Sequence, residues 1–262
     1  MNPWLGFIFT AKSFFGPTWK QKRIRFFLFF SLLPLFITLL ISLLGLAISL
    51  RGDWRGEVYL SNFLAYYLQF LTPLLALFTG ISLIGDEIDD RTIHYLTGSS
   101  FPRYAVLLGK FAAVALASVL LIIAGFLPAM ISTGILLGRS GLALEALLAT
   151  GVLVISLLAY CAFFTFLGVF MKRAVLFGLF FVFGWENLVQ YLPGLPQKLT
   201  LNHYVKSLLP SLQQSKGPFS LLVNPTPPWP ALFFLLAVVF LFLSAATLIF
   251  SRREYGGHAG AD

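Results

Sequence analysis

The sequence predicts an all-α membrane protein with six transmembrane helices, an N-terminal interfacial helix and short outer helices, re-entrant or interfacial, between spans five and six. Of the 262 residues, 58% are apolar and only 11% are charged, whereas a soluble domain carries about 25% charged residues. This scarcity of charge excludes a water-soluble globular fold, and the apolar excess excludes a disordered chain. We therefore expect a single transmembrane domain over residues 1–262, surrounded mainly by lipid.

Six apolar segments are long enough to cross a bilayer, because a spanning helix needs about 20 mostly apolar residues. None of them contains Lys or Arg, and they cover residues 26–48, 63–85, 111–137, 149–170, 174–191 and 231–250. The fifth segment differs from the others because Glu186 lies within it. Before the first segment, residues 4–15 are aromatic and apolar and are followed by basic residues, which predicts a helix lying in the membrane interface.

The Lys and Arg residues are unevenly divided between the two sides of the membrane. Twelve of the 18 fall on the side that holds both ends of the chain, and six fall on the other side. By the positive-inside rule, both termini are expected in the cytoplasm. Topology and anionic lipid headgroups therefore explain the net charge of +8 better than nucleic-acid binding does.

The sequence shows no catalytic motif. The string at residues 108–111 contains Gly109 and Lys110 but lacks the earlier Gly and the following Ser or Thr of a phosphate-binding loop. No His-Glu-x-x-His pattern occurs, and Cys161 is the only cysteine. We therefore expect neither a metal site nor a bound cofactor nor enzymatic activity in this chain. A membrane-embedded enzyme remains a less favoured alternative.

Glu186 and its neighbours are candidates for an outer gate or pathway. An ionisable side chain within a span costs about 2.5–3.5 kcal/mol on insertion scales and commonly marks a functional position. The candidates are Trp185, Glu186, Asn187 and Gln190. Two interpretations stay open, because Glu186 can be buried or can lie near the outer surface in contact with water. An ion-coupled transporter or channel is a further alternative, but it would be expected to carry several such residues.

The cytoplasmic connection at residues 86–110 carries the most informative pattern. Its first part, residues 86–97, can extend the second span as a helix that Gly98 ends. Ser100 and Pro102 then predict the start of the next helix. Four carboxylates stand at the beginning of this connection and basic residues stand at its end. The pattern favours a helix-turn-helix elbow that docks another protein over a solvated loop.

The outer connection at residues 192–230 holds eight of the fourteen prolines and an amphipathic pattern between them. The apolar stripe has the spacing i, i+3, i+4, i+7, i+8 and consists of Leu201, Tyr204, Val205, Leu208 and Leu209. His203, Lys206 and Ser207 take the other face. This predicts a short helix that lies at the outer interface or dips into it, whereas a Pro-rich tether would not need the stripe.

The cytoplasmic elbow resembles that of the integral-membrane permeases of type-2 ABC transporters. The matching positions are Glu87, Asp89, Thr92, Arg103, Gly109 and Lys110, with Arg91 where the family usually has Gly and with Pro102 shifted next to Arg103. The outer end of the fifth span is similar as well, with Trp185-Glu186 followed by Leu192-Pro193 and the run at residues 199–204. The resemblance extends over essentially the whole chain in the number and order of spans.

The resemblance implies a permease subunit of an ATP-driven exporter in a prokaryotic inner or plasma membrane. It implies a second permease, as homodimer or heterodimer, and a separate ATP-binding cassette subunit that holds ATP and Mg²⁺. Contacts that couple the chain to this ATPase are expected at Asp86, Glu87, Asp89, Asp90, Arg91, Thr92, Arg103 and Lys110. The outer helices are expected to cap the exit. Spans rich in Phe, Leu and Ala favour a lipid-like or amphipathic cargo over a highly charged one.

Overall fold

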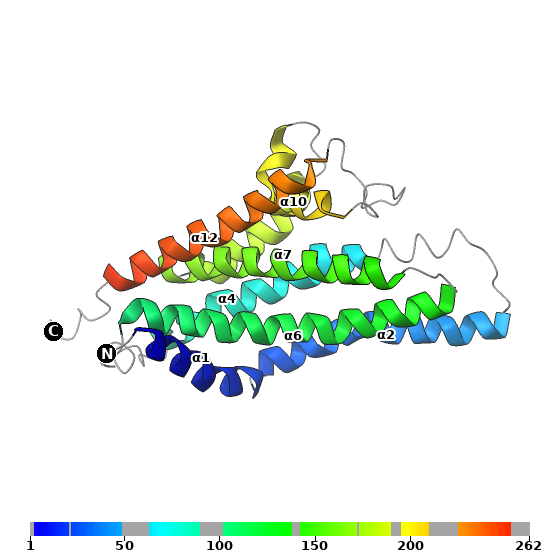
Figure 1. Ribbon diagram of the computed structural model, residues 1–262, viewed down its shortest axis with the longest axis horizontal. Coiled ribbons are helices and arrows are strands. Elements are labelled where there is room, and N and C mark those ends of the chain that lie inside the picture. The colour runs from blue at the N-terminus through cyan, green and yellow to red at the C-terminus, as the bar shows by residue number, and fades with distance from the viewer. Residues whose placement is uncertain are drawn as a thin grey trace.

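The structure is a computed structural model that describes residues 3–20, 22–48, 63–89, 102–137, 142–171, 173–189, 195–209 and 225–252. Every regular element within these ranges is a helix, as Figure 1 shows. This confirms the prediction of an all-α protein.

The helices follow one another in the order expected from the apolar segments. They are α1 (Pro3–Lys20), α2 (Lys22–Ile48), the π-helix η1 (Tyr66–Leu71), α4 (Thr72–Asp89), α6 (Arg103–Leu137), α7 (Leu142–Phe170), α8 (Ala174–Phe180), the π-helix η2 (Phe181–Glu186), α9 (Asn187–Val189), the 3₁₀-helix η3 (Leu195–Leu199), α10 (Leu201–Ser207) and α12 (Pro228–Arg252). Each predicted span lies within one helix or one continuous helical run, except for residues 190 and 191, which lie outside the described ranges.

Four of these helical runs are long and apolar enough to cross a membrane, by length and composition. They are Phe63–Leu83, Arg103–Gly134, Leu144–Phe170 and Pro228–Arg252. Among the described residues, Ile24–Ile37 and Ala174–Val189 form shorter apolar helices. The helical positions of the predicted spans are therefore confirmed, whereas the count of six membrane crossings stays a prediction.

Close contacts between backbones hold the first half of the bundle together. α1 and α2 both pack on α6, and α4 packs on α7, which also contacts α12. At the crossing of α2 and α6, a Cβ atom on Gly125 would overlap with Ser31. The Ser31 hydroxyl donates to the carbonyl of Leu121 at 3.0 Å, and the Tyr67 hydroxyl of η1 donates to the carbonyl of Ser31. Three elements that are distant in the sequence therefore meet at one point.

Aromatic rings fill the second half of the core. Phe163 of α7 lies 4.5 Å from Phe181 of η2 and 5.1 Å from Phe242 of α12, measured between ring centroids. Such tilted and edge-on pairs contribute about 0.5–1.5 kcal/mol each beyond the burial of their area. They join the fourth, fifth and sixth predicted spans.

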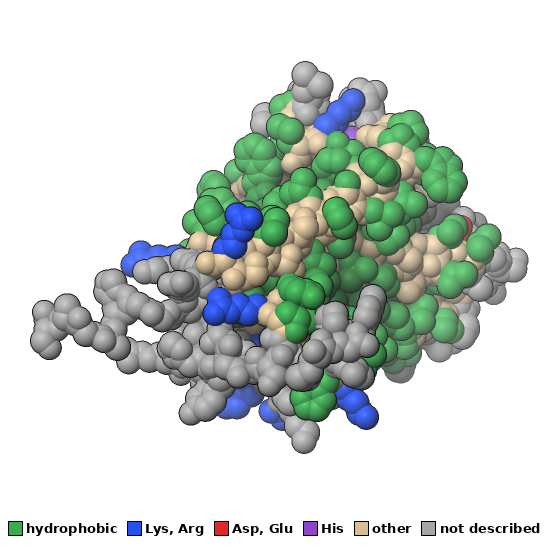
Figure 2. Space-filling model, turned by 60° about the vertical axis from the view of Figure 1, so that its left-hand side comes forward, with side chains coloured by type: hydrophobic (Ala, Val, Ile, Leu, Met, Phe, Trp, Pro, Cys, Tyr) green, Lys and Arg blue, Asp and Glu red, His purple; other side chains and the backbone are tan. Residues whose placement is uncertain are grey.

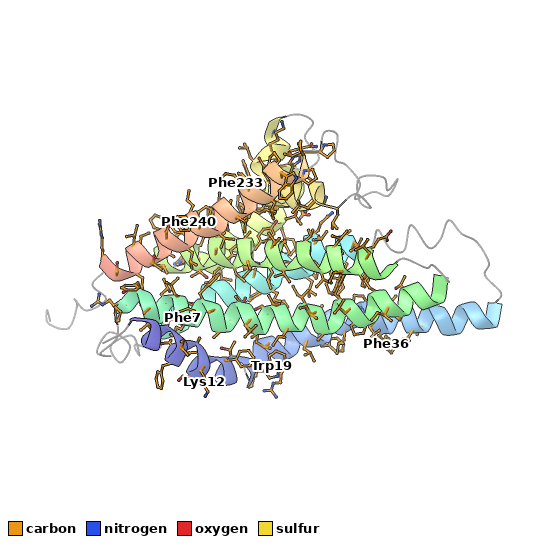
Figure 3. All side chains as sticks on the ribbon, in the orientation of Figure 1. Phe7, Lys12, Trp19, Phe36, Phe233 and Phe240 are labelled. Atoms are coloured by element: carbon orange, nitrogen blue, oxygen red, sulfur yellow. The ribbon has the colours of Figure 1, made fainter. Side chains whose placement is uncertain are left out.

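The surface of the molecule is apolar over much of its area. Figure 2 shows hydrophobic side chains over most of the described part of one face, with Lys and Arg side chains scattered among and around them. On α12, Phe233 and Phe240 point away from the bundle and are 76% and 78% exposed (Figure 3). Exposed apolar area of this extent is unfavourable in water and natural in a bilayer, so the molecule is built as an integral membrane protein.

The elbow between the second and third spans is described at its two ends. α4 continues as a helix to Asp89, beyond the predicted end of the span, and α6 begins at Arg103. The carbonyl of Pro102 accepts hydrogen bonds from the amides of Ala105 and Val106 at 2.9 and 3.3 Å. The chain is therefore helical at residues 86–89 and again from Arg103. The rest of the first predicted elbow helix, residues 90–97, and the predicted turn with Gly98 and Ser100 lie outside the described residues.

Candidate functional site

The predicted fifth span changes its helical geometry in its outer half. After α8, the six residues of η2 wind as a π-helix that ends at Glu186. The second predicted span contains another π-helix, η1, and Phe70 of η1 contacts Phe183 of η2 with ring centroids 6.4 Å apart. π-Helical turns are rare and occur frequently at functional sites. Two of them in contact mark this region as the candidate site.

Glu186 is buried against the outer helix α10. Its carboxylate is 3% exposed and accepts hydrogen bonds from the amides of Leu201, at 2.9 Å to Oε1, and Asn202, at 3.0 Å to Oε2. The first amides of a helix have no acceptor within that helix, so the carboxylate oxygens supply the acceptors that the helix backbone lacks. We call these two hydrogen bonds the α10 latch. Of the two interpretations of Glu186, the structure supports burial.

The start of α10 is completed by its own N-cap residue. The Thr200 side chain accepts a hydrogen bond from the amide of His203 at 3.3 Å, as Ser and Thr commonly do at this position. Three consecutive amides at the beginning of α10 are therefore satisfied, two of them by Glu186. Helix α10 depends on a residue that lies fifteen positions earlier in the sequence.

The structure confirms a short helix at the predicted apolar stripe but buries its polar face as well as that stripe. His203, Lys206 and Ser207 are all at most 5% exposed. The His203 Nε2 atom lies 2.9 Å from the Thr226 hydroxyl, and the Thr226 amide donates to the Ser207 hydroxyl at 3.2 Å. Because polar groups from the segment that leads into α12 meet this face, it does not need water.

On the apolar side, α10 is fastened to the sixth predicted span. The ring of Tyr204 stacks on Phe234 of α12, with centroids 3.9 Å apart and planes 19° apart. Figure 1 shows α10 beside the beginning of α12, at the side of the bundle away from the beginning of α6. Helix α10 therefore lies between the end of the fifth predicted span and the start of the sixth.

Lys206 adds a basic group to this site. Burial lowers the pKa of its ammonium to about 8, although the nearby Glu186 carboxylate acts in the opposite direction. The loss of hydration therefore outweighs the attraction to the carboxylate. The site thus combines an acid and a base in a region from which water is largely excluded.

Sequence reasoning missed further polar groups of the site. Tyr160 of α7 is 1% exposed, and its hydroxyl interacts with the Glu186 carboxylate. Buried polar atoms without a hydrogen-bond partner in the described part of the chain include Nε2 of Gln69 in η1 and the hydroxyls of Thr72 in α4 and Ser156 one turn before Tyr160. Their signal in the sequence is weak, because isolated polar residues are common in apolar helices.

The other predicted outer candidates lie elsewhere. The Trp185 side chain is exposed, and the Asn187 side chain donates to the carbonyl of Val182 at 2.7 Å, within its own helical run. Gln190 lies outside the described residues. Of the four candidates, Glu186 is the one that described hydrogen bonds join to α10.

At the opposite end, the predicted coupling residue Lys110 lies beneath the N-terminal helix. It is 4% exposed, and its Nζ atom lies 4.4 Å from the centroid of the Phe14 ring of α1. On the preceding residue, Gly109, a Cβ atom would come within 2.8 Å of the Thr10 Cβ and 2.9 Å of the Phe7 carbonyl oxygen. The glycine therefore lets α1 lie directly on α6 and cover Lys110.

The remaining coupling candidates are only partly described. Asp86, Glu87 and Asp89 lie in the last turn of α4, and Arg103 is the first residue of α6. α4 and α6 pack on one another, so the acidic and basic parts of the elbow belong to neighbouring helices. Asp90, Arg91 and Thr92 lie outside the described residues.

The fold defines a class: an integral membrane protein built from packed apolar helices, with a polar site buried at one end and a covered basic residue at the other. A comparison with protein families narrows this class, because the model of the family described as ABC-2 family transporter protein matches residues 11–255. The chain belongs to this family and is a membrane permease of an ABC transporter. Membership implies association with an ATP-binding cassette subunit. None of the curated proteins compared matches the chain.

Proposed function

We propose that this chain is the permease subunit of an ATP-driven exporter. Its six helices cross a prokaryotic inner or plasma membrane with both ends in the cytoplasm, and it pairs with a second permease, identical or different. ATP and Mg²⁺ bind to the separate cassette subunit, and this chain supplies the pathway. The observation that carries the proposal is the family match over residues 11–255, which includes both the cytoplasmic elbow and the outer site.

The cytoplasmic elbow transmits the motion of the cassette subunit. Residues 86–110 join the second span to the third directly, so a push on the elbow tilts both. Helix α1 moves with them, because the close contact at Gly109 and the Lys110–Phe14 contact hold it on α6. Packed helices shift as rigid bodies rather than deforming continuously, which makes α1, the end of α4 and the start of α6 one mechanical unit.

The outer helices close the exit of the pathway. Support comes from the contacts of α10, which is fastened to the fifth span by the α10 latch and to α12 by Tyr204 and Thr226. A tilt of the fifth or sixth span therefore pulls on α10. The apolar composition of the spans favours a lipid-like or amphipathic cargo, such as a molecule with a polar head and a hydrocarbon body.

The coupling elbow is tested by replacing one acidic and one basic contact together. We expect Glu87→Ala with Arg103→Ala to insert normally into the membrane and to lose most of the bound cassette subunit, because both charged contacts are removed. The measurement is the amount of ATPase retained by the tagged permease in mild detergent, together with the ATPase activity of the complex in nanodiscs. Neither readout requires the cargo to be known.

A matched control makes the same change of charge away from the elbow. Glu145 and Lys198 are exposed residues of α7 and η3, and Glu145→Ala with Lys198→Ala should retain the cassette subunit in full. Equal retention by both double variants would refute the coupling role of the elbow. Absence of any ATP-binding protein from the wild-type preparation would refute the proposed function itself.

A further inference from the structure

Thr226 fastens the segment before α12 to helix α10. Its amide donates to the Ser207 hydroxyl at 3.2 Å, and its own hydroxyl lies 2.9 Å from the Nε2 atom of His203. Positions 225, 227 and 228 are prolines, which have no amide hydrogen. Thr226 therefore carries the only backbone donor of residues 225–228. We call its two hydrogen bonds to α10 the α12 clasp.

The α12 clasp lies directly before the sixth predicted span. The carbonyl of Pro227 accepts a hydrogen bond from the amide of Ala231 at 3.2 Å, so the first turn of α12 follows Thr226 at once. Proline fixes its own φ and restricts the residue before it, which makes this segment stiff. Release of Thr226 would therefore free the beginning of α12 itself and not a slack loop.

The α12 clasp is built for the neutral form of His203. The ring is 4% exposed, and its Nδ1 atom has no hydrogen-bond partner among the residues that the structure describes. A buried N–H without an acceptor is costly, so the proton of the neutral ring belongs on Nε2, where the Thr226 hydroxyl can accept it. A second proton would put an N–H on Nδ1 and a full charge on a buried ring.

The nearest cations also oppose a charge on this ring. Burial holds the pKa of His203 below its ordinary value of 6.5, and Lys198 of η3 and Lys206 of α10 act in the same direction. Both lysines are like charges toward a protonated imidazole. The ring is therefore fastened in a place that accepts it neutral and rejects it charged.

The other titratable groups around α10 do not offset this effect. Glu186 of η2 directs its carboxylate to the first two amides of α10, and the same carboxylate attracts Lys206. Tyr204 contacts the His203 ring edge-on, with centroids 5.2 Å apart. Like the tyrosines of α7 and η1, it is a phenol and is neutral in acid. In α12, residues 228–251 include no ionisable side chain.

We propose that the α12 clasp is an acid-sensitive fastening, closed while His203 is neutral and opened when the imidazole takes up a proton and moves into water, which releases the beginning of α12 from α10. Its use in transport, as a response to acidity on the outer side of the membrane, rests on the proposed function. Its existence does not. The experiments below use the purified chain without nucleotide or ATPase, so failure of the exporter hypothesis is seen separately.

The first experiment measures hydrogen exchange of the Thr226 amide between pH 7.5 and about pH 5. Each rate is divided by the intrinsic rate at that pH, and a short peptide around residues 225–228 reports this one amide. Because opening takes up one proton, protection should fall by up to about tenfold for each pH unit below about 6.5. Above pH 7 it should be constant.

His203→Gln identifies the group that titrates. Glutamine can still bond to the Thr226 hydroxyl but does not take up a proton, so most of the acid-induced loss of protection should disappear. The Glu186 carboxylate is present in both proteins, so the difference between them belongs to His203. His258→Gln is the matched control and should retain the full effect. Equal acid dependence in the wild type and His203→Gln would overturn the proposal.

A second measurement needs no substitution in the α12 clasp, in case His203→Gln does not fold. In protein labelled with ¹³C-histidine, the ring signals of His203 are assigned by removing the other two histidines with His94→Gln and His258→Gln. We expect the Nε2–H tautomer at pH 7.5 and a titration midpoint below 6.5. A neutral ring with its proton on Nδ1, or a midpoint at 6.5 or above, would rule out the acid-sensitive clasp.

Discussion

At Lys206, burial and a neighbouring carboxylate act on the same ammonium in opposite directions. Burial removes hydration and favours the neutral amine, while Glu186 favours the charged form, and the pKa settles at about 8 because burial dominates. In the unfolded chain the same group has a pKa of about 10.4. Between these two values the unfolded state binds more protons than the folded state.

This difference predicts how stability depends on pH. Where the unfolded state binds more protons, the free energy of unfolding rises with pH, so the penalty of burying the charge is present below about pH 8 and disappears toward pH 10.5. We expect Lys206→Met to remove this rise. The measurement is the thermal midpoint of the purified protein between pH 7 and about pH 11, in steps of roughly half a unit.

Lys198 is the control for this titration, since it is an exposed lysine in the neighbouring η3. Lys198→Met should leave the pH dependence as it is in the wild type. If Lys198→Met and Lys206→Met have the same pH profile, burial of Lys206 is not the cause of the rise.

Helix α1 packs closely on the start of α6 because Gly109, at the point of contact, has no side chain. We call this contact the α1–α6 joint. At Gly109, a Cβ atom would press on Thr10 and on the carbonyl oxygen of Phe7, whereas at Gly151 of α7 it would meet nothing within 4 Å. The same substitution at these two glycines therefore has opposite physical consequences. Both positions lie in helices, so the intrinsic effect on helix propensity is the same.

We predict that Gly109→Ala weakens the joint and that Gly151→Ala does not. Overpacking of this kind costs about 1–3 kcal/mol, whereas Gly to Ala within a helix without a clash gains about 0.5–1 kcal/mol. The measurements are the thermal midpoint and the rate of tryptic cleavage after Lys12, an exposed residue of α1 (Figure 3). Faster cleavage is expected in Gly109→Ala only.

The Gly109→Ala substitution also tests the coupling mechanism. Gly109→Ala should also reduce the ATPase activity of the complex, if α1 moves together with α6. A stable Gly109→Ala protein with unchanged ATPase activity would show that α1 does not take part in transmitting the motion of the cassette subunit.

The whole molecule is arranged so that the beginning of α1 and the end of α12 lie at the same end of the bundle (Figure 1). This agrees with the sorting of basic residues, because most Lys and Arg belong to the side that holds both ends of the chain. Helices η3 and α10 lie in the connection that precedes α12, and on this topology they face outward.

The topology predicts which positions a reagent that cannot cross the membrane will reach. In a Cys161→Ala background, Lys198→Cys should be labelled by an impermeant maleimide in spheroplasts, whereas Lys12→Cys should be labelled only after lysis. Both side chains are exposed, so a difference between them reports the side of the membrane. Labelling of Lys12→Cys before lysis would refute the orientation, and protection of both would refute the outer position of η3.

The positions of the helices could be predicted because their signal is local. A run of about 20 apolar residues demands a helix wherever the solvent is lipid, since every backbone polar group must be satisfied within the segment. The apolar stripe at residues 201–209 predicted α10 in the same way. The start of the helix after the cytoplasmic elbow was also readable, because Pro102 restricts the backbone at that point.

The partners of the polar side chains could not be predicted, because they come from distant parts of the chain. Glu186 was recognised as unusual, but its hydrogen-bond partners are two amides of α10, and the Tyr160 hydroxyl beside it had no distinguishing pattern. The polar face of α10 was expected opposite its apolar stripe, and only the approach of Glu186 and Thr226 explains why it is buried.

By itself, the sequence determined that this is a membrane protein, which segments are helical, and which family its elbow resembles, because these depend on composition and on short-range spacing. Only the tertiary structure decided that Lys110 lies beneath α1 and that Glu186 accepts hydrogen bonds from the first amides of α10. The physical reason is that hydrophobic burial specifies which segments are helical, while hydrogen bonds in a region without water depend on atoms that only the packed helices bring together.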